Sequence, residues 1–214
     1  MKSNLIATIA AVLLLASTSL GQDDLFKLWP DSTLAKANSA ADVEYMTEEE
    51  KQAVYYINLV RINPPLFSET FLKDYLKAND IKKDKEVKGL ITELESTSKM
   101  GYLRPNKKLA DFARQHASDM GNSGRTGHNT SKGESFRKRI EPLQSSFSAI
   151  NENCNYGNEG GIDAVIDLLI DRNVPNLGHR RNILDPEMEL VGVAIEPHKK
   201  WRFNCVQNFG IRKK

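Results

Sequence analysis

The chain has 214 residues, of which 40% are hydrophobic and 27% are charged, proportions that are ordinary for a globular domain with one hydrophobic core. Its 30 Lys and Arg residues nearly balance its 28 Asp and Glu residues, so the formal net charge is only +2 at pH 7. A chain this close to neutral lacks the basic excess with which proteins bind polyanions, and we therefore expect no nucleic-acid partner.

The first 21 residues have the composition of a secretory signal peptide. Lys2 precedes an apolar run from Leu5 to Ala16, and small residues lead up to a cleavage site between Gly21 and Gln22. The run is much shorter than the ~20 residues that a helix needs to span a bilayer. The sequence therefore predicts a secreted or periplasmic protein that is cleaved near Gly21 and Gln22 and has no membrane span.

Two parts follow this leader. Residues 22–46 are polar and show little periodicity, which predicts an extended lead-in before a single domain over residues 47–214. Within that domain, Thr47 and Glu50 have capping-box spacing and predict the start of a helix that ends before Pro64. Apolar residues at helical spacing predict four further helices, near residues 67–76, 87–94, 109–121 and 162–170, the third of these ending at Gly121.

Strand patterns occur in the second half of the chain. Apolar, aromatic and β-branched side chains are concentrated near residues 148–156, 190–195 and 201–209. Helices that are followed by helices alternating with strands predict an α/β fold with an α/β/α layered arrangement, and they argue against a helical bundle.

Two histidines and two acids in the second half could bind a metal ion: His128, Glu152, Asp171 and His179. Imidazole and carboxylate groups are the usual nitrogen and oxygen ligands of zinc and similar divalent cations. The same groups could polarise a water molecule or transfer protons. The spacing is not diagnostic by itself, because the sequence has no pair of histidines one helical turn apart and no cysteine cluster.

Three other polar features have two interpretations each. His116 falls on the apolar face of a predicted helix, where a packed histidine with one satisfied ring nitrogen is the simpler interpretation than a functional one. Cys154 and Cys205 could form a disulfide worth about 4 kcal/mol in an oxidising compartment, or could remain buried thiols that pack as small apolar side chains. Arg180 could bind an acidic ligand, but we favour pairing with Asp185 or Glu187 that shapes the turn before the next strand.

Several segments resemble the CAP superfamily, which comprises cysteine-rich secretory proteins, antigen 5 and pathogenesis-related class 1 proteins. The helix before the family's first cavity histidine is similar to LADFARQHASDM, and that histidine corresponds to His128 in SGRTGH. The family's Gly-Glu-Asn strand resembles NENCNYG, its second histidine motif in the bacterial form resembles GHRRNILDPEMELVGVAI, and its closing strand resembles VQNFG. The resemblance covers nearly all of the chain after the leader, from about Thr47 to Gly210.

The resemblance implies a three-layer α/β/α sandwich with a small, mostly antiparallel central sheet flanked by helices. It also implies a shallow cavity with a tetrad of two histidines and two acids, which would be His128, Glu152, Asp171 and His179. Asp171 takes the place of the family's second Glu when LLID is aligned with the end of the preceding helix. Asn151 replaces the usual Gly before Glu152, and Cys154 replaces an aliphatic residue. In several members the cavity holds zinc or magnesium, so the expected cofactor is a divalent cation, with zinc first and magnesium or calcium as alternatives.

The expected function is a secreted binding or interaction module, a monomer whose partner is an unidentified extracellular protein, glycan or lipid. The sequence shows no convincing set of nucleophile, base and orienting residue, so an enzyme is not favoured. The first alternative is a metal-assisted, peptidase-like hydrolase with Glu152 as the candidate general base. The second alternative is a lipid or sterol carrier in which Phe67, Phe71 and Tyr75 line a groove, although core packing explains that stripe more simply.

Overall fold

The computed structural model describes residues 22–214, and the predicted signal peptide, residues 1–21, lies outside the described residues. The expected extended lead-in is wrong, because residues 22–46 contain two short helices, α1 (Gln22–Phe26) and α2 (Asp31–Ala37). Leu25, Trp29 and Ala37 of this segment are buried in the main core. Burial of these apolar side chains against the domain stabilises helices that the local pattern alone does not predict.

The central sheet has four strands: β1 (Arg104–Pro105), β2 (Phe147–Tyr156), β3 (Leu190–His198) and β4 (Arg202–Arg212). Their spatial order is β1-β3-β4-β2, with β1 parallel to β3 and all other pairs antiparallel. The three strands expected from sequence are confirmed, and the two-residue β1 is an addition. The order makes β2 an edge strand, and this position shapes the site described below.

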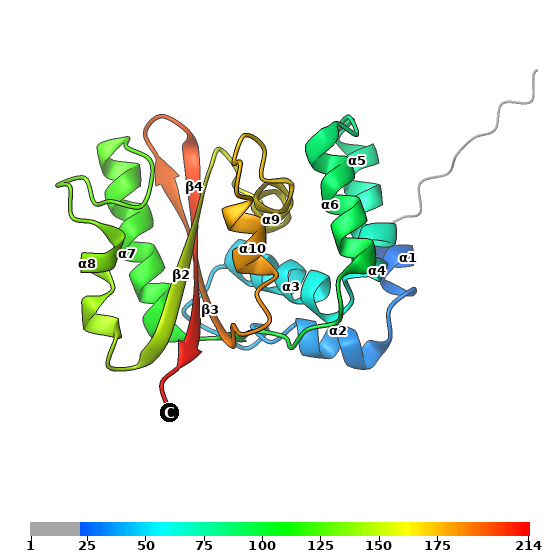
Figure 1. Cartoon of the computed structure of the whole chain (residues 1–214), viewed down its shortest axis with the longest axis horizontal. Coiled ribbons are helices and arrows are strands. Elements are labelled where there is room, and N and C mark those ends of the chain that lie inside the picture. Colours follow the sequence, from blue (N-terminus) through cyan, green and yellow to red (C-terminus); the bar gives the residue numbers. More distant parts are fainter. Residues whose placement is uncertain (1–21) are drawn as a thin grey trace, which may run out of the picture.

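Helices cover both faces of the sheet (Figure 1). One face packs against α7 (Lys107–Ser123), with α8 (Phe136–Arg139) and the 3-10 turn η2 (Glu141–Leu143) beside it. The other face packs against α3 (Glu48–Ile62), α9 (Gly161–Ile170) and α10 (Gly178–Ile183). Beyond these lie α4 (Pro64–Phe67), the π-helical turn η1 (Ser68–Leu72), α5 (Lys73–Ala78) and α6 (Lys85–Ser96). The predicted three-layer α/β/α sandwich with a mostly antiparallel sheet is confirmed. Within residues 22–214, no helix is both long enough and apolar enough to cross a membrane.

The ends of the two longest helices have local causes. The Thr47 hydroxyl accepts from the N–H of Glu50 at 3.3 Å, and the Glu50 carboxylate accepts from the N–H of Thr47 at 2.9 Å, so the predicted capping box starts α3. The expected end of α7 at Gly121 is wrong, because the helix continues to Ser123 and ends at Gly124, whose φ of 69° is left-handed. A Cβ at Gly121 would lie 2.1 Å from the carbonyl oxygen of Pro197, so this glycine instead lets α7 approach β3.

The aromatic stripe that could have lined a lipid groove belongs to the core. Phe67 and Phe71 are 0% and 3% exposed, and their ring centroids lie 6.1 Å apart. Phe71 also packs against Trp29 at 5.7 Å, and the Tyr75 hydroxyl donates to Asp163. Core packing is therefore confirmed as the explanation of this stripe.

Cys154 in β2 and Cys205 in β4 are free, buried thiols. Cys154 is opposite Val206 in the strand register, whereas Cys205 is opposite Asn155. Because side chains alternate between the two faces of a sheet, the two thiols point to opposite faces. Accordingly, Cys154 packs with Ala113 of α7, and Cys205 belongs to the core on the other side. A disulfide needs Cβ atoms about 4 Å apart and facing each other, so the candidate disulfide does not form in this fold.

Candidate functional site

A cavity of about 500 Å³ opens beside β2. Since β2 pairs with β4 on one side only, its other side is a free sheet edge, and residues from both outer layers can meet there. His128 and Cys154 line the cavity from the α7 side, and Asp171 and His179 line it from the side of α9 and α10. The half-exposed ring of Trp201 also lines the cavity. The structure thus brings three of the four predicted tetrad residues to one cavity, with Glu152 buried behind it.

The first histidine is anchored by a carboxylate. Nδ1 of His128 lies 3.1 Å from Oε1 of Glu152. An ionised carboxylate can only accept a hydrogen bond, so Nδ1 carries the proton and Nε2 carries the lone pair. The His128 side chain is 45% exposed, and its Nε2 has no partner among residues 22–214. One ring nitrogen is therefore held in place while the other remains accessible.

Glu152 is enclosed by donors. Arg139 donates to both carboxylate oxygens, at 2.9 and 3.0 Å, and the side chains of Arg139 and Glu152 are 5% and 1% exposed. The Nδ1–H of His128 makes the third hydrogen bond to this carboxylate. The Asn208 amide makes the fourth, 3.2 Å from Oε2, when its oxygen accepts from the N–H of Ala113. Burial alone would raise the pKa of Glu152, but the hydrogen bonds from His128 and Arg139 outweigh it and hold this pKa below its usual 4.5. Glu152 is an anion whose four acceptor positions are all occupied.

The second histidine is anchored in the same way. Asp171 ends α9 with a left-handed φ of 56°, and its Oδ1 lies 2.7 Å from Nδ1 of His179. Its Oδ2 accepts from the N–H groups of His179 and Arg180, at 3.0 and 3.3 Å, so the same carboxylate caps the start of α10. The His179 side chain is 23% exposed, and Nε2 has no partner in the described part of the chain.

Two asparagines attach α10 to the edge strand. Asn153 of β2 donates to the carbonyl oxygen of His179 at 3.1 Å. Asn182 of α10 donates to the side-chain oxygen of Asn153 at 2.8 Å and to the carbonyl oxygen of Glu152 at 3.4 Å. These bonds fix His179 relative to β2, and hence relative to the His128 and Glu152 pair.

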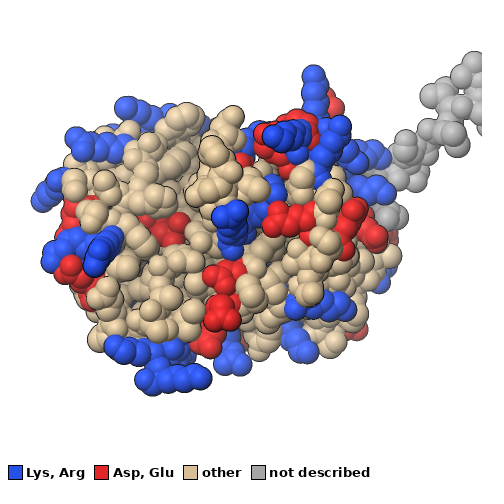
Figure 2. Space-filling model, viewed as in Figure 1, with Lys and Arg blue, Asp and Glu red and all other residues tan. Residues whose placement is uncertain are grey.

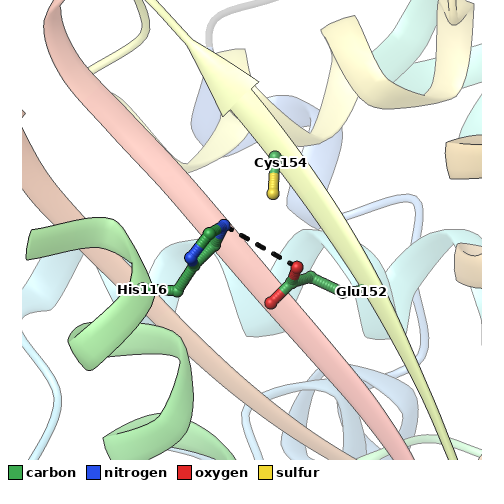
Figure 3. Close-up of side chains that lie close together, drawn as sticks. All are labelled: His116, Glu152 and Cys154. Atoms are coloured by element: carbon green, nitrogen blue, oxygen red, sulfur yellow. Dashed lines mark ion pairs between the residues drawn. The ribbon is translucent and has the colours of Figure 1, made fainter. Parts of the chain in front are cut away.

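A second group of potential ligands lies next to this site, and its three residues are buried (Figure 3). The ligand atoms of His116, Glu152 and Cys154 all lie within 4.8 Å of one another, which would admit a metal ion by distance. The His116 ring points toward Glu152 from α7 in Figure 3, and the two groups are 3.8 Å apart. However, Arg139 already donates to both oxygens of Glu152, and burial raises the pKa of the Cys154 thiol well above its usual 9.0. A cation at this triad would therefore have to compete with Arg139 and displace the thiol proton.

His116 is a packed residue with one hydrogen-bonded ring nitrogen, which is the simpler of the two interpretations offered by the sequence. It is 2% exposed, and its Nε2 lies 2.8 Å from the carbonyl oxygen of Gly127, to which it donates. Within residues 22–214, its Nδ1 has no hydrogen-bond partner. Burial is the main cause that lowers the pKa of His116 below 6.5, which keeps the ring neutral.

Sequence reasoning missed two parts of the site. Arg139 lies in a short basic segment with no local pattern that sets it apart from its exposed neighbours, so only the fold reveals its pairing with Glu152. The helix α10 has too few apolar residues to show helical periodicity.

Arg180 has the structural role that was favoured, but its carboxylate partner is Glu93, at 2.9 Å, and not Asp185 or Glu187.

Comparison with known proteins identifies the family. The model of the Cysteine-rich secretory protein family, CAP, matches residues 54–209, which is more than half of the chain. The curated proteins contain no match to the chain.

Several solved structures also match the chain. An outer surface protein from Borrelia burgdorferi is 21% identical, with 62% of this chain and 97% of that chain covered and a TM-score of 0.45. An extracellular protein containing a SCP domain from Bacillus anthracis is 15% identical, with 91% of this chain and 45% of that chain covered and a TM-score of 0.46. Venom allergen-like protein 4 from Schistosoma mansoni is 15% identical, with coverages of 79% and 92% and a TM-score of 0.46. On the strength of the family model, the chain belongs to the CAP family of cysteine-rich secretory proteins.

Proposed function

We propose that the protein is a secreted binding module whose cavity at the edge of β2 binds zinc through Nε2 of His128 and Nε2 of His179. The single observation that carries the proposal is the matched anchoring of the two rings. Each Nδ1 faces a buried carboxylate, each ring lines the same cavity, and neither Nε2 has a hydrogen-bond partner among the described residues. Histidines that bind metals usually donate their other ring N–H to a carboxylate in this way.

The two carboxylates support the histidines in this proposal, which changes the role expected for them. Glu152 is enclosed by Arg139, and the oxygens of Asp171 accept from the His179 ring and from the N–H groups of His179 and Arg180, so both carboxylates are engaged in holding the histidines. A site built from imidazole nitrogens favours zinc, whereas magnesium and calcium prefer oxygen ligands. Two protein ligands leave coordination positions for a partner's donor or for water.

The same contacts weaken the hydrolase alternative. A general base must reach the proton that it removes. Glu152 has a 1% exposed side chain, and its carboxylate accepts from His128 and Arg139. Secretion itself is part of the proposal, and the leader pattern supports it.

The test is thermal unfolding of residues 22–214 after treatment with a chelator, and then with zinc, magnesium or calcium. Zinc at a hundred times its dissociation constant stabilises by about 2.7 kcal/mol, which raises the midpoint of a domain this size by about 5 to 10 °C. His128→Ala and His179→Ala should each reduce this rise, and magnesium and calcium should produce none.

The control is Asn176→Ala, which changes an exposed residue of the loop before α10 and should keep the full zinc response. Each variant is compared with its own metal-free midpoint, so a general loss of stability is not mistaken for a loss of zinc binding. A zinc response that persists in both histidine variants would refute the proposal.

A further inference from the structure

The turn between β3 and β4 exposes an unusual set of side chains. Lys199, Lys200, Trp201 and Arg202 are all exposed, and the Trp201 side chain is 50% accessible. The loop after α7 packs against this turn, since a Cβ at Gly124 would lie 3.5 Å from the Lys200 side chain, and it adds the exposed Arg125. We call these five residues, Arg125 and 199–202, the basic–aromatic tip.

The charges of the tip are not compensated. Within the described residues, none of its four cations forms an ion pair with a carboxylate. Figure 2 shows Lys and Arg side chains over the upper left of the molecule, where Figure 1 places the β3–β4 turn and the end of α7. The whole chain has a net charge of only +2, so this is a local excess of positive charge around an exposed indole ring.

The tip is held in one shape by a buried histidine. His198 is 3% exposed, and its Nδ1 accepts from the N–H groups of Lys200 and Trp201, both at 3.2 Å. Its Nε2 therefore carries the proton and donates to the carbonyl oxygen of Arg125 at 2.8 Å. Arg202 adopts a φ of 67°, which is costly for a residue other than glycine. Both nitrogens of one buried ring thus serve to order a strained turn that displays cations and a tryptophan.

We propose that the basic–aromatic tip binds the surface of a membrane that contains anionic lipids. Tryptophan is enriched where membranes meet water, because its ring is apolar and its N–H is polar. Each Lys or Arg near an anionic surface contributes about a fivefold increase in binding, and this attraction weakens within a Debye length. A turn that projects at one end of the central sheet suits a flat partner better than it suits a chain that must be enclosed in a groove (Figure 1). This inference goes beyond the zinc site and does not depend on it.

The test is co-sedimentation of residues 22–214 with vesicles of phosphatidylcholine, alone or mixed with phosphatidylglycerol. The protein should bind the mixed vesicles and should be released by high salt. Lys199→Glu/Lys200→Glu should weaken binding by at least about 25-fold, since two attractive charges are removed and two repulsive charges are added. Trp201→Ser should also weaken it. The fluorescence of the wild type should shift to the blue on binding, and Trp201 is the source because Trp29 is 3% exposed.

Lys82→Glu/Lys83→Glu is the matched control, because it makes the same change in net charge at two exposed lysines before α6. Leu28→Ser removes the other large exposed apolar residue of the part of the chain that the structure describes, which is 52% accessible. Both controls should bind the mixed vesicles to within about threefold of the wild type. The lysine double variant of the tip and both controls should keep the unfolding midpoint and the zinc response of the wild type.

Three results would overturn the proposal: no binding to the mixed vesicles, an equal loss in the lysine control, or binding to soluble heparin without binding to vesicles. The last result would assign the tip to a soluble polyanion. Because the vesicle assay is run in the presence of a chelator, its failure and the failure of the zinc proposal are separate outcomes.

Discussion

Replacing Arg139 with Met tests the buried centre of the site, because it removes the guanidinium and keeps an unbranched side chain. Arg139 donates to Glu152 at 2.9 and 3.0 Å and to the carbonyl oxygen of His128 at 2.8 Å. The Glu152 side chain is 1% exposed, so it would remain a buried charge without a cationic partner. Breaking such a pair costs about 3–5 kcal/mol, which lowers the unfolding midpoint of a domain this size by about 6–20 °C.

Urea unfolding of three variants measures this effect. Arg172→Met is the matched control, because its pair with Asp84 has a similar N–O distance of 2.9 Å but side chains that are 35% and 38% exposed. Its loss should cost much less, since water screens an exposed pair. The double variant Arg139→Met/Glu152→Gln should be more stable than Arg139→Met alone, because no buried charge is left unpaired. The reasoning fails if Arg139→Met costs no more than the control, or if the double variant recovers no stability.

Four further outcomes follow from the packing. Cys154 and Cys205 should resist alkylation in the folded protein, and without reductant both should react after unfolding, whereas a disulfide would leave no reactive thiol. Burial raises the pKa of Cys205 from 9.0 to about 12, so its thiol stabilises the fold below pH 9. Wild type should then lose about 1.4 kcal/mol per pH unit relative to Cys205→Ala between pH 9 and 12, as measured by urea unfolding, and a constant difference would contradict this. Gly192→Ala should cost at least about 2 kcal/mol in urea unfolding, because the new Cβ would lie 2.1 Å from the backbone of α7. Gly89→Ala is the control: a Cβ there would meet no atom within 4 Å, so the change should stabilise the helix by about 0.5–1 kcal/mol. Asp171→Asn suits the left-handed backbone at this position but removes a charged acceptor from the His179 ring. It should therefore destabilise the fold by about 1–3 kcal/mol and reduce the zinc-dependent rise in the unfolding midpoint. An unchanged rise would show that the carboxylate does not orient the ring.

Features that depend on neighbouring residues could be predicted from the sequence. The capping box of Thr47 and Glu50 forms as expected, because the two residues need only one turn of helix to meet. The long strands were visible because β-branched and aromatic residues cluster in them. The layered fold follows from the order of these elements, and the CAP resemblance adds the mostly antiparallel sheet.

Features that depend on strand register or long-range pairing could not be predicted. Whether Cys154 and Cys205 share a face is decided by the pairing of β2 with β4, which places Cys154 opposite Val206. Arg139 reaches Glu152 only because of the path that the chain takes between α7 and β2, and no pattern near Arg139 in the sequence indicates this pairing. The helices of residues 22–46 form because Leu25 and Trp29 are buried against a core that the local sequence does not contain.

The place of the cavity follows from the sheet order. An edge strand leaves backbone groups that must be covered or occupied, and in this chain Asn182 covers part of the edge by donating to the Glu152 carbonyl oxygen. Because side chains alternate along β2, Glu152 holds the His128 loop on one face while Asn153 holds the His179 backbone on the other. Two consecutive residues of one strand thereby bring together loops from opposite layers. Both acids of the tetrad are used in fixing these loops and rings, so in the proposed site the chemistry offered to a ligand is that of the two remaining imidazole nitrogens.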